Sequence, residues 1–78
     1  MLKVSAYILI NTEIGKVDEV LTGLKEIEEV KSAYSITGPY DIIAFVESED
    51  LVSLGSIVVQ KVQKVEGISK TLTCLIVK

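Results

Sequence analysis

The sequence contains no histidine, no arginine and no tryptophan, and it has a single cysteine. Without histidine, the chain cannot build a histidine-activated serine or cysteine nucleophile or a histidine-ligated metal site. The lone Cys74 excludes an internal disulfide and fits a reducing compartment. Because no paired general acid and base stand out either, we expect no catalytic centre, no metal site and no cofactor.

Positive charge is also scarce. Eight lysines face eleven acidic residues, the net charge is −3, and the lysines are scattered along the chain. Nucleic-acid binding depends on clustered basic residues, so we expect no direct contact with DNA or RNA. No apolar run approaches the roughly 20 residues of a membrane-spanning helix, and the N-terminus lacks the pattern of a secretion signal. We therefore expect a cytoplasmic protein that does not bind membranes.

The chain is rich in aliphatic residues. Hydrophobic residues make up 49% of the 78, which suits one small domain over residues 1–78. Apolar alternation predicts strands, and apolar residues at helical spacing predict helices. We predict strands at 2–10, 30–36, 42–46 and 68–77, and helices at 17–27 and 51–65. This order is the α+β, ferredoxin-like βαββαβ arrangement: a four-stranded antiparallel sheet with two helices on one face and the first and third strands in its middle.

The two predicted helices leave the other face of the sheet uncovered. The residues that we assign to this open face give it an apolar centre: Tyr7, Leu9, Ile43, Phe45 and Leu75. A contiguous apolar patch typically marks a subunit interface, although single surface hydrophobes are also ordinary. We predict an oligomer interface on this face and place Cys74 on the opposite, core-facing side of the last strand.

A tight turn, Gly38-Pro39-Tyr40-Asp41, joins the second and third predicted strands. Turn geometry explains Gly38 and Pro39 but not Asp41. The Asp41 carboxylate would either accept hydrogen bonds from turn amides or meet the ammonium group of a ligand, whose carboxylate the free turn amides would then bind. An amino acid carries both groups and is the natural candidate ligand.

Two segments resemble one known family. Residues 33–46 resemble the Gly-any-Tyr-Asp hairpin in the C-terminal effector domain, or RAM domain, of the Lrp/AsnC family, and residues 65–73 are similar to its closing Val-x-Gly-Val-x-x-Thr-x-Thr segment. The resemblance implies homodimers that pair through their sheets, assembly into octamers or related rings, and amino-acid effectors in clefts between dimers. By position it implicates these effector-binding residues: Thr37, Gly38, Tyr40, Asp41, Thr71 and Thr73. The two threonines are equally explained as β-branched residues of an edge strand.

The helix-turn-helix of full-length family members has no counterpart in these 78 residues, so DNA binding is not carried over. We expect a stand-alone module that senses an amino acid and modulates transcription or metabolism through a partner, for which a full-length Lrp/AsnC regulator is the candidate. Three alternatives remain. An ACT-like sensor would bind its ligand at the turn 11–15; a structural assembly subunit would use the Gly-Pro-Tyr-Asp turn only for packing; a ferredoxin-like enzyme would use the open face as a pocket.

Overall fold

The computed structural model describes residues 3–78 and has the predicted ferredoxin-like βαββαβ order. The predicted start of the first strand, Leu2, lies outside the described residues. The elements are β1 (Val4–Thr12), α1 (Val17–Lys25), β2 (Val30–Ser35), β3 (Ile42–Ser48), α2 (Leu51–Ile57), a π-helical continuation η1 (Val58–Val62) and β4 (Ile68–Leu75).

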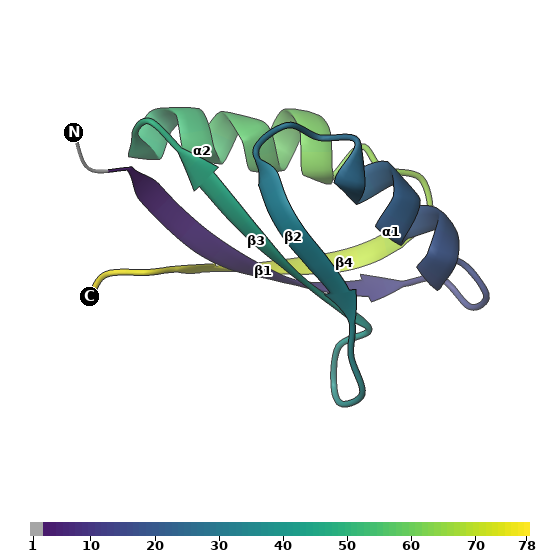
Figure 1. Cartoon of the computed structure of the whole chain (residues 1–78). Helices are drawn as coiled ribbons and strands as arrows, with labels where there is room; N and C mark the ends of the chain where they lie inside the picture. Colours follow the sequence, from purple (N-terminus) through teal and green to yellow (C-terminus); the bar gives the residue numbers. More distant parts are fainter. Residues whose placement is uncertain (1–2) are drawn as a thin grey trace.

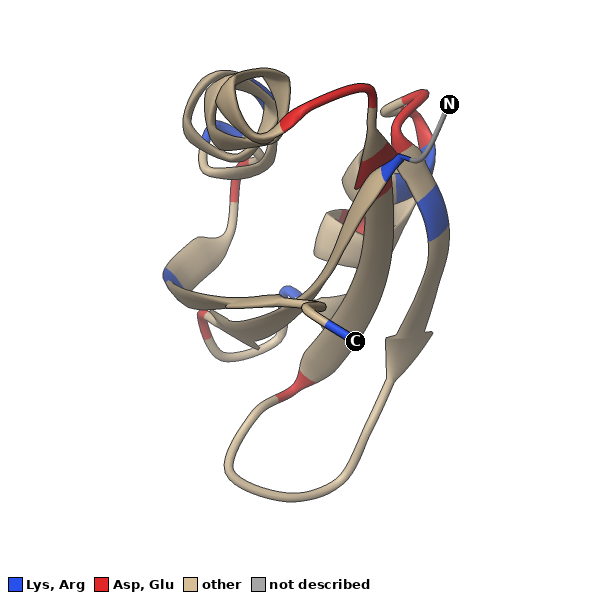
Figure 2. Ribbon diagram, turned by 90° about the vertical axis from the view of Figure 1, so that its left-hand side faces the viewer, with Lys and Arg blue, Asp and Glu red and all other residues tan. Residues whose placement is uncertain are grey.

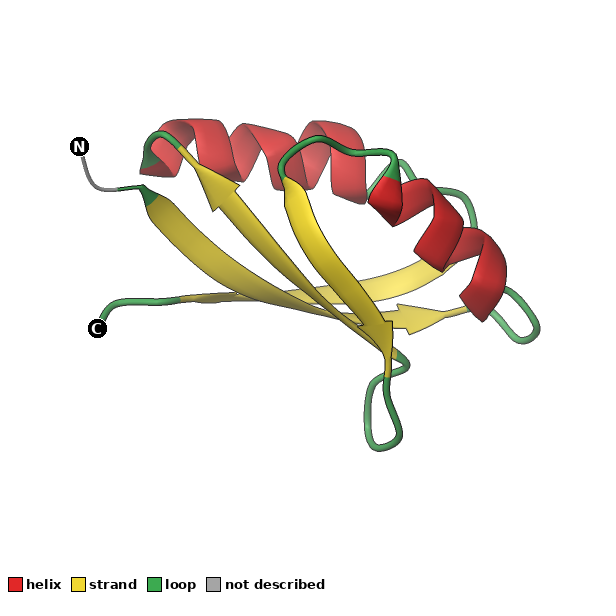
Figure 3. Ribbon diagram, in the orientation of Figure 1, coloured by secondary structure: helices red, strands yellow, loops and turns green. Residues whose placement is uncertain are grey.

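The four strands form one antiparallel sheet in the order β2-β3-β1-β4, so the first and third strands lie in the middle, as predicted. Both helices cover the same face of this sheet, and no helix of residues 3–78 lies on the opposite face (Figure 1). The β2–β3 connection extends past the end of the sheet, away from the helices (Figure 3).

The core lies between the helices and the central strands. Because strand side chains alternate, every second residue of β1 and β3 points toward the helices. These positions and the inner sides of the helices supply the most deeply buried residues: Ala6, Ile8, Ile10, Ile42, Ala44, Val46, Val20, Leu24, Leu54 and Val62. Full burial of a valine, leucine or isoleucine contributes about 1.5–3 kcal/mol, so an aliphatic core can hold this small domain together.

The second helix changes its winding partway along. Asp50 caps its start, since its carboxylate accepts a hydrogen bond from the Ser53 backbone N–H at 2.7 Å. At its end the Gln63 N–H donates to the Val58 carbonyl at 2.9 Å, the i to i+5 bond of a π-helix.

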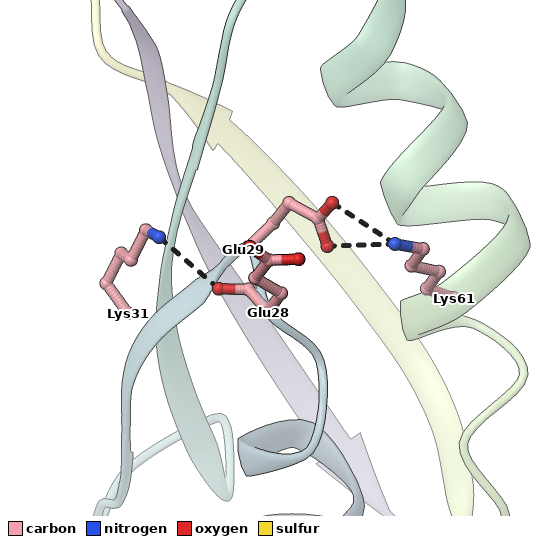
Figure 4. A network of polar contacts seen from close by, with 4 residues as sticks. All are labelled: Glu28, Glu29, Lys31 and Lys61. Carbon is pink, nitrogen blue, oxygen red and sulfur yellow. Dashed lines mark hydrogen bonds and ion pairs between the residues drawn. The ribbon is translucent and has the colours of Figure 1, made fainter.

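An ion pair ties the π-helical segment to the start of β2. The Lys61 ammonium lies 3.0 and 3.1 Å from the two carboxylate oxygens of Glu29, which precedes β2 (Figure 4). This hydrogen bond from Lys61 is the main reason why the pKa of Glu29 is lowered from its ordinary value.

The two sides of β4 are the reverse of those predicted. Thr71, Thr73 and Leu75 lie opposite buried residues of β1 and therefore face the helices, whereas Leu72 and Cys74 lie on the open face. The placement of Leu75 on the open face was wrong. The placement of Cys74 in the core was wrong as well, since Cys74 is exposed.

A β-bulge explains this reversal. Ile68 lies opposite Thr12 and Lys70 lies opposite Asn11, which leaves Ser69 as an extra residue in β4. Ile68 does pack against the core, as predicted. Counting every second residue from Ile68 then gives the wrong side, because one extra residue exchanges the two faces of everything beyond it.

Candidate functional site

The predicted turn is an exposed loop at one end of the sheet. Thr37, Gly38 and Pro39 are exposed at its tip, and Tyr40 and Asp41 are half-buried at its base. The Ile36 N–H donates to the Asp41 carbonyl at 2.9 Å and closes the loop. Gly38 has a φ of +148°, which side-chain-bearing residues rarely adopt, so the turn conformation itself requires glycine there. Asp41 is the only charged residue between Lys31 and Glu47, so the rest of the loop is uncharged (Figure 2).

Asp41 connects this loop to the end of β1. One of its carboxylate oxygens, Oδ2, accepts hydrogen bonds from the Thr12 backbone N–H at 2.8 Å and from the Thr12 hydroxyl at 3.3 Å. Its own backbone N–H donates to the Ile10 carbonyl at 2.9 Å. The carboxylate thus bonds to the neighbouring strand rather than to the turn amides. Among the described residues Oδ1 has no hydrogen-bond partner, so this oxygen can still meet a cation.

Thr71 belongs to a polar hollow of about 300 Å³ at the same end of the sheet, where η1 meets the start of β4. The Gln63 side chain donates to the Thr71 hydroxyl at 3.4 Å, and the Ser69 hydroxyl donates to the Asn11 carbonyl at 3.2 Å. Lys70 also lines this hollow. Only β1 separates the hollow from the anchored loop, since β1 lies between β3 and β4 in the sheet.

Thr73 lies two residues further along β4 in a different environment. It borders an apolar groove of about 340 Å³ between the second helix and β4, which is otherwise lined by Leu51, Leu54, Gly55, Val58, Val59 and Leu75. The structure therefore brings Thr71, but not Thr73, to the end of the sheet where the turn lies. Sequence reasoning missed the hydrogen bonds that Thr12, Ser69 and Gln63 make at this end of the sheet, because these bonds join distant segments or neighbouring elements and carry no local signal.

The open face carries four of the five predicted interface residues. Tyr7 lies opposite Phe45 and Leu9 lies opposite Ile43 on the two central strands, on the side away from the helices. The rings of Tyr7 and Phe45 contact each other with centroids 5.2 Å apart. Leu72 of β4 extends this apolar surface next to Leu9.

Charges and possible metal ligands are dispersed. Lysines lie singly among acidic residues rather than in one patch (Figure 2). Within residues 3–78, no three histidine, cysteine or acidic side chains are grouped to hold a metal ion. No helix in this part of the chain is long and apolar enough to cross a membrane.

The fold defines the chain as a small α+β domain of the ferredoxin-like class. Residues 5–78 match the sequence profile of the Lrp/AsnC ligand binding domain, and the chain belongs to this family. The family is regulatory rather than enzymatic, and its domains bind small effectors such as amino acids and oligomerise.

Three proteins illustrate the similarity. The crystal structure of FFRP-DM1 superposes with a TM-score of 0.90 at 38% identity, over 95% of this chain and 99% of that one. The HTH-type transcriptional regulator Ptr1 of Methanocaldococcus jannaschii is 30% identical over 82% of this chain, which spans 43% of the regulator. A homocitrate synthase of Sulfolobus acidocaldarius is 40% identical over 67% of this chain, which spans 11% of the enzyme.

Proposed function

We propose that the chain is an amino-acid-sensing regulatory module whose effector site is built on the β2–β3 turn and completed by another copy of the chain. The observation that carries this proposal is the anchored loop: its tip is exposed and uncharged, and its base presents one free carboxylate oxygen of Asp41. An anchored loop keeps its backbone amides in a fixed geometry, which lowers the entropic cost of ligand binding.

In this proposal the two ends of an amino acid meet different parts of the turn. The free Oδ1 of Asp41 receives the ligand's ammonium group, and the backbone N–H groups around Thr37 and Gly38 bind its carboxylate. Tyr40 supplies an aromatic surface and a hydroxyl group for the ligand's side chain. Thr71 fits the site better than Thr73, because it lies at the same end of the sheet as the turn.

A single copy offers only half of such a site, since the tip of the turn faces solvent. We propose that copies pair through Tyr7, Leu9, Ile43 and Phe45 of the open face. The resulting homodimers assemble into a ring, with an octamer as the expected size, and the turn of one dimer meets residues of the next.

The regulatory output reaches a partner rather than DNA. A full-length Lrp/AsnC regulator is one partner class, supported by the match to Ptr1. The match to part of a homocitrate synthase supports an enzyme of metabolism as the second class. Co-purification with each class, with and without ligand, separates the two.

Calorimetry with each of the twenty amino acids tests the site. At least one should bind, and Asp41→Asn and Tyr40→Ala should each weaken it about tenfold, which corresponds to the loss of one charged or aromatic contact. Glu13→Gln, in the turn where an ACT-like sensor would bind, should leave the affinity unchanged. Absence of binding by all twenty, or unchanged affinity in both turn variants, refutes the proposal, and a loss of affinity in the Glu13 variant favours the ACT-like site.

A further inference from the structure

The polar hollow at the start of β4 is lined by one positively charged side chain and by no negatively charged one. Its volume is about 300 Å³, and its lining consists of Gln63, Ile68, Ser69, Lys70 and Thr71. Within residues 3–78, the Lys70 ammonium has no ion-pair partner. A hollow lined in this way suits a group of negative charge, because an ammonium forms its strongest hydrogen bonds with an ionised acceptor.

The hydrogen bonds inside the hollow leave donors available. The Gln63 amide donates one N–H to the Thr71 hydroxyl oxygen at 3.4 Å. The second amide hydrogen of Gln63 and the hydroxyl hydrogen of Thr71 therefore have no acceptor among the described residues. The Ser69 hydroxyl already donates to the Asn11 carbonyl. Two neutral donors beside one ammonium are a set from which a carboxylate, an acceptor with two oxygens, can accept hydrogen bonds.

The anchored turn does not distinguish the charge of a ligand's side chain. Asp41 is its only charged residue, and the proposed site uses this carboxylate for the ammonium group that all amino acids share. The backbone amides around Thr37 and Gly38 likewise meet the carboxylate that all amino acids share, and Tyr40 is neutral. Selection by side-chain charge therefore has to come from another part of the site.

We propose that the hollow selects an effector with a carboxylate side chain, aspartate or glutamate, and that Lys70 determines this preference. The hollow lies at the same end of the sheet as the turn, where the turn of one copy is proposed to meet another copy. The preference belongs to that assembled site and therefore rests on the proposed function. In it the side-chain carboxylate accepts hydrogen bonds from Gln63 and Thr71 and lies next to the Lys70 ammonium.

Asparagine and glutamine are the matched ligands, because they have the shapes of aspartate and glutamate without the negative charge. The net charge of −3 on each chain disfavours a negatively charged ligand, although salt screens this long-range repulsion. A preference for the acid over its amide therefore requires a local positive group, and Lys70 is the one that lines the hollow.

Calorimetry with these four amino acids tests the preference. The wild-type protein should bind aspartate or glutamate about tenfold more tightly than the corresponding amide, which is the effect of one charge-assisted contact, and the difference should shrink as salt is added. Lys70→Met should weaken binding of the acid about tenfold and leave binding of the amide unchanged. Lys64→Met, in the turn after η1, removes an equal charge outside the hollow and should change neither affinity.

Gln63→Glu provides a second variant with nearly the same side-chain shape. It places a carboxylate beside Thr71 and should reverse the preference, so that the amide binds more tightly than the acid. Gln63 and Lys70 are both exposed, so neither substitution should disturb the fold, which circular dichroism checks. An acidic preference that survives both substitutions refutes the role of the hollow.

The wild-type protein separates failure of this preference from failure of the proposed function. If it binds neutral amino acids as tightly as aspartate and glutamate, the selection by Lys70 is refuted and the amino-acid site stands. If it binds none of the twenty amino acids, both are refuted.

Discussion

At the scale of single residues, Asp41 is the residue of the candidate site whose contacts the structure defines best. The sequence left two roles open for it, hydrogen bonding within the turn or contact with a ligand. In the structure its carboxylate bonds to Thr12 at the end of β1, through one oxygen only. Asp41 thus fixes the loop to the sheet, and its other carboxylate oxygen has no hydrogen-bond partner among the described residues. No pattern in the sequence points to Thr12, because the bond joins residues 29 positions apart.

This anchor predicts a measurable stability effect. Asp41→Ala removes both hydrogen bonds and leaves the Thr12 N–H without its charged partner, so it should lower the free energy of unfolding by about 1.5–3 kcal/mol. Thr12→Val removes only the longer, hydroxyl bond and should cost about 0.5–1.5 kcal/mol. Urea unfolding of the two variants measures this difference. Equal stability of Asp41→Ala and wild type would show that the anchor contributes nothing.

Two helical glycines provide a matched pair at the same scale. Gly55→Ala places a methyl group in open space and removes the glycine penalty, so it should stabilise the protein by about 1 kcal/mol. At Gly23 an added Cβ would lie 2.8 Å from a Val65 methyl carbon, so Gly23→Ala should gain less or destabilise the fold. Thermal unfolding measures the stabilisation by each substitution. A larger stabilisation by Gly23→Ala than by Gly55→Ala would contradict the packing described for both sites.

At the scale of the elements, sequence periodicity located every helix and strand but not their fine geometry. The two faces of β1 and β3 were assigned correctly, because these central strands are regular and every second residue lies on the same face. The two faces of β4 were assigned the wrong way round, because the bulge at Ser69 cannot be recognised from the hydrophobic pattern. The π-helical winding of η1 could not be predicted from the sequence either, because apolar residues continue through it at near-helical spacing.

The ion pair between η1 and β2 predicts a pH dependence. Lys61 lowers the pKa of Glu29, so the pair contributes stability above the ordinary glutamate pKa of about 4.3, and this contribution is lost as the pH falls through the lower pKa of the folded protein. Both side chains are partly exposed, so Lys61→Met should cost only about 0.5 kcal/mol at pH 7.

The matched control for this pair is Lys64→Met, in the turn two residues beyond the end of η1. Lys64 forms no ion pair within the described chain, so its removal should have a smaller effect at pH 7. Urea unfolding at pH 7 and at about pH 2.5 compares the variants. The destabilisation by Lys61→Met should shrink at the acidic pH, and an effect of equal size at both pH values would contradict its electrostatic origin.

At the scale of the whole molecule, an uncovered apolar sheet face predicts association. Tyr7 and Phe45 form its centre on the two middle strands, and Tyr7 is 44% exposed in the single chain. Tyr7→Asp should therefore reduce the assembly to a smaller species in sedimentation. Val52→Asp, at an 84% exposed position of α2, introduces the same charge away from the sheet and should not. If the Tyr7→Asp variant assembles to the wild-type size, the open face is not the subunit interface.

The family assignment and the fold could be predicted from the sequence, because the hairpin motif, the closing motif and the apolar periodicity are all local features of the chain. The shape of the candidate site could not be predicted from the sequence, because it depends on contacts between distant segments of the chain. Thr71 and Thr73 are adjacent members of one motif, yet one lies in a polar hollow and the other in an apolar groove. Only the structure separates these two environments.

We propose above that this chain binds an amino acid as an oligomer. Native mass spectrometry, with and without a mixture of the twenty amino acids, measures assembly and bound ligand together. We expect a homo-oligomer with an even number of chains that gains the mass of one kind of amino acid. An oligomer that gains no mass in the mixture, or a monomer in both conditions, would contradict it.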